Sequence, residues 1–212
     1  MLELYWGPGS IALASMIALN DAGAEHRLRR IDFAREEQKS AEYLAINPKA
    51  RVPTLVTPQG RLTETPAILA FIAQTHPDTR LAPTNAWDFA KMQELNAYLC
   101  ATLHVAHAHR MRGPRWADDP AAWEAMKHKV PQSVGECFAY IEAHALTGPY
   151  AMGEQYTVAD PYLFTVSRWM EADSLDPARY PKVTAHREMM ASRESAWKAL
   201  AEYEAPEAAT GA

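Results

Sequence analysis

Residues 47–55 read Asn47-Pro48-Lys49-Ala50-Arg51-Val52-Pro53-Thr54-Leu55, a turn followed by a strand that carries a proline near its start. Asn-Pro is typical turn chemistry, and β-branched residues favour a strand from Val52 to Thr57. Because proline cannot donate to a strand ladder, Pro53 belongs on an edge strand or at a strand's beginning. The alternative is a cis Val52–Pro53 peptide bond, which leaves the neighbouring backbone able to pair with another group.

The segments on either side of this stretch alternate between strand and helix patterns. Downstream, Gln59-Gly60 predicts a hairpin turn into a strand over 61–63, and Pro66 opens a helix. Upstream, apolar alternation predicts strands over 2–6 and 26–33. Between them, Gly7-Pro8-Gly9 breaks the chain and Ser10 is a candidate N-cap for a helix over 11–22. This order predicts a small α/β domain over residues 1–80.

The second half of the chain has a different pattern. Residues 75–86 contain two prolines and are predicted to be a linker. Long periodic stretches over 87–112, 120–146, 157–173 and 183–203 then predict an all-helical bundle, which we place at 86–205. The small and polar end, 204–212, is predicted to fray.

Composition and charge exclude several classes of protein. The formal net charge of −5 and a pI of about 5.9, without a basic stripe, disfavour a nucleic-acid partner. No apolar run approaches the roughly 18 residues that a membrane span requires, and the N-terminus lacks the pattern of a signal peptide. The two cysteines, Cys100 and Cys137, lie far apart, so we expect no disulfide framework and a cytoplasmic protein.

Four segments in chain order resemble the glutathione transferase superfamily, and within it the bacterial beta-like and theta-like members. They are Leu4-Tyr5-Trp6-Gly7-Pro8-Gly9-Ser10, the turn and strand at 47–55, Leu62-Thr63-Glu64-Thr65-Pro66-Ala67-Ile68-Leu69, and Tyr156-Thr157-Val158-Ala159-Asp160. The resemblance covers nearly the whole chain. It implies a thioredoxin-like domain that holds glutathione, an all-helical domain behind it, and a homodimer.

The resemblance also implies a glutathione site whose chemistry the residues can provide. The backbone of Val52, beside Pro53, would pair with the peptide-like centre of glutathione as an added strand does. Glu64 and Thr65, ahead of a helix, would hold the γ-glutamyl end, although ordinary helix capping is the alternative. Lys39 and Arg51 could meet the glycine carboxylate or could be solvated surface residues.

The group that activates the thiol is the open part of this interpretation. Beta-type relatives carry a cysteine and then a serine where this chain has Ile11 and Ala12, which makes mixed-disulfide chemistry doubtful. Ser10 resembles the serine of delta- and theta-like transferases, and a plain N-cap is its alternative role. Tyr5 is the second candidate, since a tyrosine at the end of the first strand activates the thiol in other branches.

Residues of the helical half have weaker signals. His104 aligns with a site-lining histidine of beta-type members, and Trp6, Arg112 and Trp116 are candidates for shaping a co-substrate pocket. We expect no metal site at the histidines 104, 107 and 109, because no cysteine or carboxylate stands at a useful spacing. Thr157 and Asp160 form a capping box with Asp in place of Glu, followed by a proline whose placement the sequence does not explain.

Two functions of different classes follow. The first is an enzyme that joins the glutathione thiol to an apolar electrophile, with Ser10 stabilising the thiolate. The second is a glutathione-binding carrier or interaction module with little turnover, which the missing cysteine at position 11 favours. The sequence does not specify the electrophile.

Overall fold

The computed structural model describes residues 1–205, which divide into two compact units. Residues 1–79 and those described from Ala191 onward form the first unit, and Arg80–Met190 form the second. The domain limits predicted from the sequence, 1–80 and 86–205, stay a prediction, although the last helix groups with the sheet. Of the tail predicted to fray, only Glu204 and Ala205 lie within the described residues.

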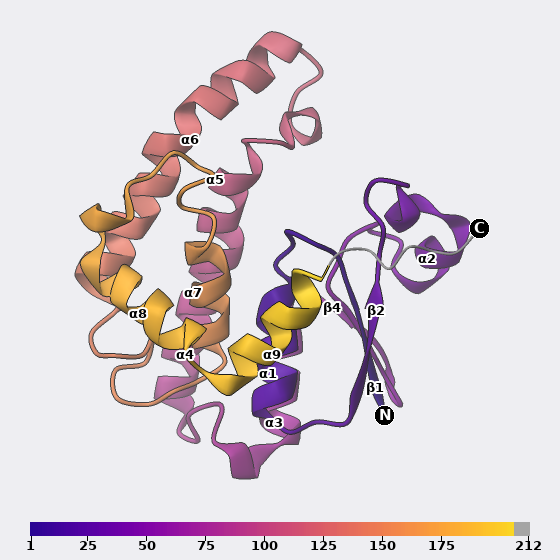
Figure 1. Ribbon diagram of the computed structural model, residues 1–212, viewed down its shortest axis with the longest axis vertical. Coiled ribbons are helices and arrows are strands. Elements are labelled where there is room, and N and C mark those ends of the chain that lie inside the picture. Colours follow the sequence, from indigo (N-terminus) through magenta and orange to yellow (C-terminus); the bar gives the residue numbers. More distant parts are fainter. Residues whose placement is uncertain (206–212) are drawn as a thin grey trace. The chain divides into compact units, whose positions relative to one another are not determined.

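The first unit is built on a four-stranded mixed sheet (Figure 1). Its strands are β1 (Leu2–Trp6), β2 (His26–Arg30), β3 (Thr54–Thr57) and β4 (Gly60–Thr63), in the order β2-β1-β3-β4. β1 runs parallel to β2 and antiparallel to β3, and β3 is antiparallel to β4. Since β3 begins at Thr54, Pro53 stands just before a central strand and removes no ladder hydrogen bond.

Helices cover both faces of this sheet. In Figure 1, α1 and α3 lie on one face, and α2 lies toward the other. Alternation along β1 explains the core: Leu4 and Trp6 are buried, whereas Glu3 and Tyr5 are only partly so. The helices of this unit are α1 (Ala12–Asp21), α2 (Ala41–Ile46), α3 (Thr65–Thr75) and α9 (Glu194–Tyr203).

Two details at the helix starts of the first unit differ from the sequence prediction. Helix α1 begins at Ala12, one residue later than expected, although the Ser10 hydroxyl does accept the Ala12 N–H at 3.3 Å. Helix α2 was not predicted at all. It begins behind Ser40, whose hydroxyl accepts the Tyr43 N–H at 3.1 Å.

The second unit is helical. Its helices are α4 (Ala86–Tyr98), α5 (His104–Ala108), α6 (Pro120–Tyr140), α7 (Ala159–Ser167) and α8 (Pro181–Ala191), with π-helical turns at Leu99–Leu103 and Ile141–Ala145. The periodic stretch over 183–203 is helical as predicted and is divided between two helices, α8 and α9. A thioredoxin-like sheet unit followed by a helical one confirms the predicted fold class.

The predicted capping box fixes the start of α7 from inside the second unit. Asp160 is fully buried and accepts the N–H groups of Thr157 and Ala151, each at 2.7 Å. His186 Nε2 donates to the same carboxylate at 3.0 Å. Pro161 falls in the first turn of α7, where an N–H has no intrahelical partner, so the proline costs no helical hydrogen bond.

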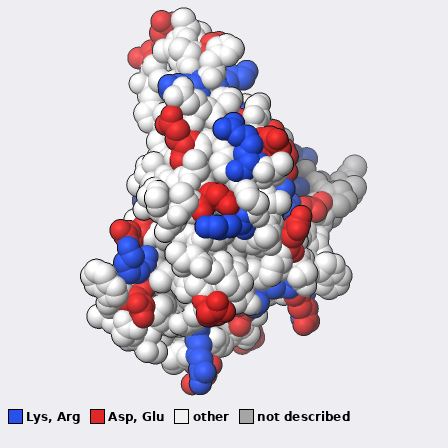
Figure 2. All heavy atoms as spheres, turned by 90° about the vertical axis from the view of Figure 1, so that its left-hand side faces the viewer, with Lys and Arg blue, Asp and Glu red and all other residues white. Residues whose placement is uncertain are grey.

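The surface drawn in Figure 2 mixes both signs of charge. Lys and Arg side chains alternate there with Asp and Glu rather than forming a single-sign stripe on the face shown. Among residues 1–205, no helix has the length and apolar character that crossing a membrane demands.

Candidate functional site

Three segments of the first unit meet at one end of the sheet. Tyr5 is opposite Thr54, and Thr54 is opposite Thr63, in two antiparallel ladders. The residues that follow β1, precede β3 and follow β4 therefore lie together at the same end of the sheet. These are the Ser10 turn, the Val52–Pro53 pair and the Glu64–Thr65 pair, which the sequence predicted to act together.

A buried polar network holds the segment before Pro53. The Arg51 carbonyl accepts from the Tyr43 hydroxyl and from Asn47 Nδ2, both at 2.7 Å. Asn47 Nδ2 also donates to Thr54 Oγ1 at 2.9 Å, and the Tyr43 hydroxyl lies 3.0 Å from the same oxygen. Burial raises the pKa of Tyr43, so its hydroxyl stays protonated and able to donate. Residues on both sides of Val52 are thus fixed.

Val52 itself is left with an unused backbone. The Val52–Pro53 peptide bond is cis, and the side chain of Val52 is half-buried. Within residues 1–205, neither its N–H nor its carbonyl has a hydrogen-bond partner. Backbone groups of this kind can pair with an extended peptide in the manner of an added strand.

Glu64 has an uncommon backbone conformation at the start of α3. Its φ of 71° is positive, which a side chain of this size rarely adopts. Its carboxylate makes no capping hydrogen bond to the helix, so the capping alternative does not describe Glu64. The side chain is 59% exposed and pairs with Lys49 Nζ at 2.6 Å.

Thr65 offers a hydroxyl and a helix start beside that carboxylate. The residue is 4% exposed, yet its hydroxyl has no partner among residues 1–205 and is not fully enclosed. The first-turn N–H groups of α3 have no intrahelical partners, and the helix dipole adds positive potential there. A ligand with a carboxylate and an ammonium group would find donors and an acceptor at this point.

Of the basic residues near the site, the sequence singled out Lys39 and Arg51, whose roles stay predictions, and it missed Lys49. Lys39 is exposed and pairs with Glu36. Arg51 is exposed, and its guanidinium has no ion-pair or hydrogen-bond partner in the described chain. Lys49 was missed, although it stands in the predicted turn, because its contact with Glu64 depends on how β3 and β4 pair.

The Ser10 hydroxyl is engaged with its own turn. It donates to the Gly7 carbonyl at 2.6 Å and accepts from the Ala12 N–H at 3.3 Å. The Ser10 carbonyl accepts from the Tyr203 hydroxyl at 2.7 Å, so α9 helps to hold this turn. To donate to a ligand sulfur, the Ser10 side chain has to rotate away from Gly7.

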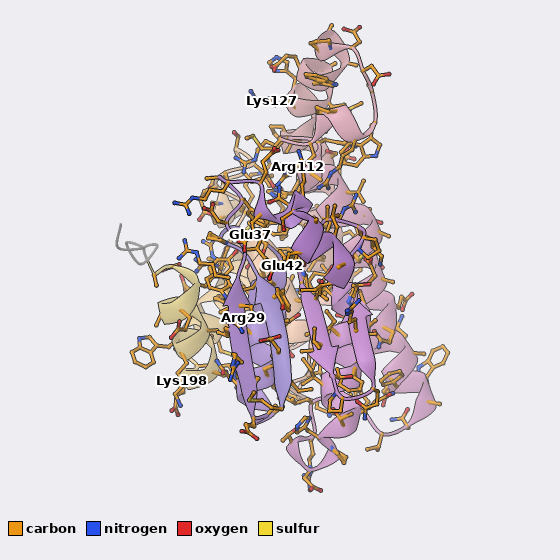
Figure 3. The ribbon with its side chains drawn as sticks, turned by 90° about the vertical axis from the view of Figure 1, so that its right-hand side faces the viewer. Arg29, Glu37, Glu42, Arg112, Lys127 and Lys198 are labelled. Atoms are coloured by element: carbon orange, nitrogen blue, oxygen red, sulfur yellow. The ribbon has the colours of Figure 1, made fainter. Side chains whose placement is uncertain are left out.

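Tyr5 lies on the α2 side of the sheet. Its hydroxyl is 3.4 Å from Glu3 Oε2, and its ring centroid is 5.5 Å from that of Tyr43. Arg29 on β2 and Glu42 on α2 are labelled on this side in Figure 3. Burial and then the Glu3 carboxylate raise the pKa of Tyr5, so its hydroxyl stays protonated and able to donate. It is the direction of the side chain, toward Glu3 and Tyr43, that favours Ser10 over Tyr5 as the group that meets a thiol.

Three other residues of the first unit near Ser10 are buried. Ile11 and Ala12, which replace the cysteine and serine of beta-type members, are 5% and 0% exposed and carry no reactive group. Trp6 is 3% exposed and stacks on Tyr203 with the ring centroids 5.7 Å apart. Its predicted part in a co-substrate pocket stays a prediction, and this packing does not favour it.

The other predicted residues belong to the second unit. His104 is half-buried, with its ring centroid 5.0 Å from that of Trp169. Arg112 is exposed, and Trp116 is 44% exposed and meets His109 edge-on. Their roles toward glutathione or a co-substrate stay predictions.

A buried carboxylate in the second unit went unnoticed in the sequence. Asp173 is 1% exposed and accepts from His107 Nδ1 at 2.7 Å, while Arg110 Nε lies 3.2 Å from its other oxygen. The His107 ring stacks on Trp169 with the centroids 4.1 Å apart. These contacts join α5 to the segment after α7 and account for one of the three histidines.

Neither cysteine forms a disulfide, and no cluster of three or more metal-binding side chains occurs among residues 1–205. Burial raises the pKa of the Cys137 thiol, which makes it a poor nucleophile at neutral pH.

Comparison with known proteins gives one consistent family. The models described as the N-terminal and C-terminal domains of glutathione S-transferase match residues 1–74 and 99–194. Glutathione S-transferase GstA of Escherichia coli O157:H7 is 31% identical over 202 residues, which are 94% of this chain and 97% of that protein. A maleylacetoacetate isomerase of Rhizobium meliloti is 29% identical over 177 residues, 78% of this chain and 80% of that one.

A solved structure is more similar still. The crystal structure of a glutathione transferase homologue from Sulfitobacter, with bound glutathione, is 42% identical to this chain with a TM-score of 0.93. The match covers 95% of this chain and 98% of that one.

Proposed function

Because the chain belongs to the glutathione S-transferase family, we propose that it binds glutathione in the first unit and joins its thiolate to an apolar electrophile. The observation that carries this proposal is the unpartnered backbone of Val52 beside the exposed Glu64 and the Thr65 hydroxyl. A relative with a different activity, the isomerase, also belongs to the comparison, so the transferase reaction rests on the chemistry of the site.

The protein has a complementary group for each of the three parts of glutathione at this end of the sheet. The peptide-like cysteinyl part pairs with the Val52 N–H and carbonyl. The α-ammonium of the γ-glutamyl part meets the Glu64 carboxylate, and its carboxylate meets Thr65 and the first turn of α3. The glycine carboxylate meets Arg51, whose guanidinium is exposed and unpaired within residues 1–205. Lys39 is the second cation for that carboxylate.

The thiolate needs stabilisation at neutral pH. A hydroxyl that donates to sulfur favours the ionised form, and so does the positive end of a helix. Ser10 donates its hydrogen bond to sulfur after turning from the Gly7 carbonyl, an exchange that costs about 0.5–1.5 kcal/mol before the new bond forms. The first-turn N–H groups of α1 add the helix contribution.

A second function, a glutathione-binding carrier with little turnover, is favoured by one observation. The Ser10 proton is already bonded at 2.6 Å, and Ile11 removes the cysteine of beta-type members. If Ser10 does not turn, glutathione binds without an activated thiol.

The experiment compares Ser10→Ala with Ser133→Ala, a control that removes a half-buried hydroxyl from α6. The pKa of the bound thiol is followed by its ultraviolet absorbance, and turnover is measured with a panel of apolar electrophiles. We expect Ser10→Ala to raise the thiol pKa by about 1–2 units and to lower kcat roughly tenfold or more. No change in either quantity would show that Ser10 is only a turn residue. Binding without turnover by the unaltered chain would favour the carrier.

Three further statements belong to this proposal. The protein acts as a homodimer, works in the cytoplasm and takes part in detoxification. Sedimentation analysis with and without glutathione tests the dimer, and fractionation of cells tests the location.

A further inference from the structure

Lys49 pairs with Glu64, the carboxylate proposed above to meet the α-ammonium of glutathione. Its Nζ donates to Glu64 Oε1 at 2.6 Å and to Thr63 Oγ1 at 2.7 Å. Resting on the proposed function above, we propose that Lys49 is a built-in substitute for the α-ammonium of glutathione and sets how strictly the site requires that group.

The Lys49–Glu64 pair is easy to open. The side chains are 48% and 59% exposed, so water solvates both charges whenever they separate. Ion pairs of this kind contribute little to stability, and the long lysine side chain regains rotational freedom when it leaves. A ligand ammonium can therefore replace the lysine at small cost.

Glu64 stays in place when the lysine leaves. Its carbonyl accepts the Ile68 N–H at 3.0 Å as part of the first turn of α3, and the unusual φ of 71° fixes the direction of its Cβ. Because the side chain caps no N–H group, no backbone contact competes for the carboxylate. Within residues 1–205, the one partner of the carboxylate is thus a movable cation, Lys49.

The exchange has a consequence for specificity. When glutathione binds, one ammonium replaces another on Glu64, so the carboxylate is paired before and after. A thiol tripeptide that lacks the α-ammonium does not displace Lys49, so Glu64 keeps its ion pair. Lys49 therefore lowers the affinity for glutathione by competition and preserves the affinity for the ligand without the ammonium.

The test uses Lys49→Met in the full chain and two ligands in calorimetry, glutathione and glutaryl-cysteinyl-glycine, which differs from glutathione by the missing α-amino group. We expect Lys49→Met to bind glutathione about two- to fivefold more tightly, since the competing pair is gone. Binding of the glutaryl peptide should stay the same or weaken. Lys49→Arg keeps a cation on Glu64 and should restore the unaltered ratio of the two dissociation constants.

The control is Lys198→Met, which removes an exposed lysine that pairs with Glu194 on α9 (Figure 3). It should leave both dissociation constants unchanged. If Lys49→Met weakens both ligands equally, Lys49 binds a carboxylate of the peptide and the proposal is wrong. An unchanged ratio likewise overturns it. Failure of the unaltered chain to bind glutathione overturns the proposed function as well, so the two failures are told apart.

Discussion

Asp160 and Glu64 both stand at the start of a helix, one in each unit, but the protein encloses only the first of them. Asp160 is fully buried and accepts hydrogen bonds from Thr157 N–H, Ala151 N–H and His186. The Glu64 side chain is 59% exposed and caps no N–H group, and within residues 1–205 its ion-pair partner is the movable Lys49.

The difference separates a structural carboxylate from a binding one. A buried carboxylate needs its hydrogen bonds to offset lost hydration, so Asp160 has no capacity left for a ligand. Glu64 keeps that capacity, and its positive φ is a conformation that the fold maintains without using the side chain for capping. Unused capacity, rather than position on a helix, is what supports the proposed role of Glu64 as the acid that meets the ligand.

The largest expected effect is on stability, from Asp160→Asn. The amide turns an N–H group toward donors whose hydrogen bonds the carboxylate accepted. It also removes the negative charge that faces His186. We expect a loss of about 3–5 kcal/mol in the free energy of unfolding, measured by urea denaturation. The folded fraction should still bind glutathione normally. A loss below about 1 kcal/mol would contradict the structural role of Asp160.

Glu64→Gln should have the opposite pattern. The free energy of unfolding should change by no more than about 0.5 kcal/mol, because the side chain supports nothing inside the protein. The glutathione dissociation constant should rise roughly tenfold to a hundredfold, since a hydrogen bond between two charged groups is lost. Calorimetry measures the change, with Glu194→Gln as the control on α9. Equal affinities for the two variants would remove Glu64 from the site.

The smallest effects should come from the two threonines beside these acids. Thr157→Ala removes the acceptor of the Ala159 N–H, which it bonds at 3.3 Å. This change should lower the free energy of unfolding by about 1 kcal/mol and leave the affinity for glutathione unchanged. Thr65→Ala should instead weaken glutathione binding about three- to tenfold and leave thermal unfolding nearly unchanged. Loss of stability in Thr65→Ala with unchanged affinity would erase the contrast between the two helix starts.

Much of the fold could be predicted because local patterns carry it. The strand at 54–57, the proline before it and the capping box of Asp160 all follow from adjacent residues. Helix α2 could not be found by periodicity, since Tyr43 is its only buried residue. The π-helical turn at Leu99–Leu103 has no breaking residue, so the sequence predicts one uninterrupted helix there.

The candidate site was predictable in its residues but not in its contacts. Val52, Glu64 and Thr65 stand in recognisable motifs. The pairing of Lys49 with Glu64 spans 15 positions and exists only in the register of β3 against β4. The hydrogen bond of Ser10 to Gly7 is local, but whether a serine hydroxyl turns inward is decided by the turn geometry and not by residue type.

The bond from Tyr203 to Ser10 spans 193 positions and carries a consequence for biosynthesis. Domains tend to fold in order as the ribosome delivers them, the earliest part first. Here the turn after β1 is completed by α9, which follows the helical unit in the chain, so a nascent chain with a finished sheet still lacks a partner for the Ser10 carbonyl. The helical unit must therefore be translated before the first unit has all of its contacts.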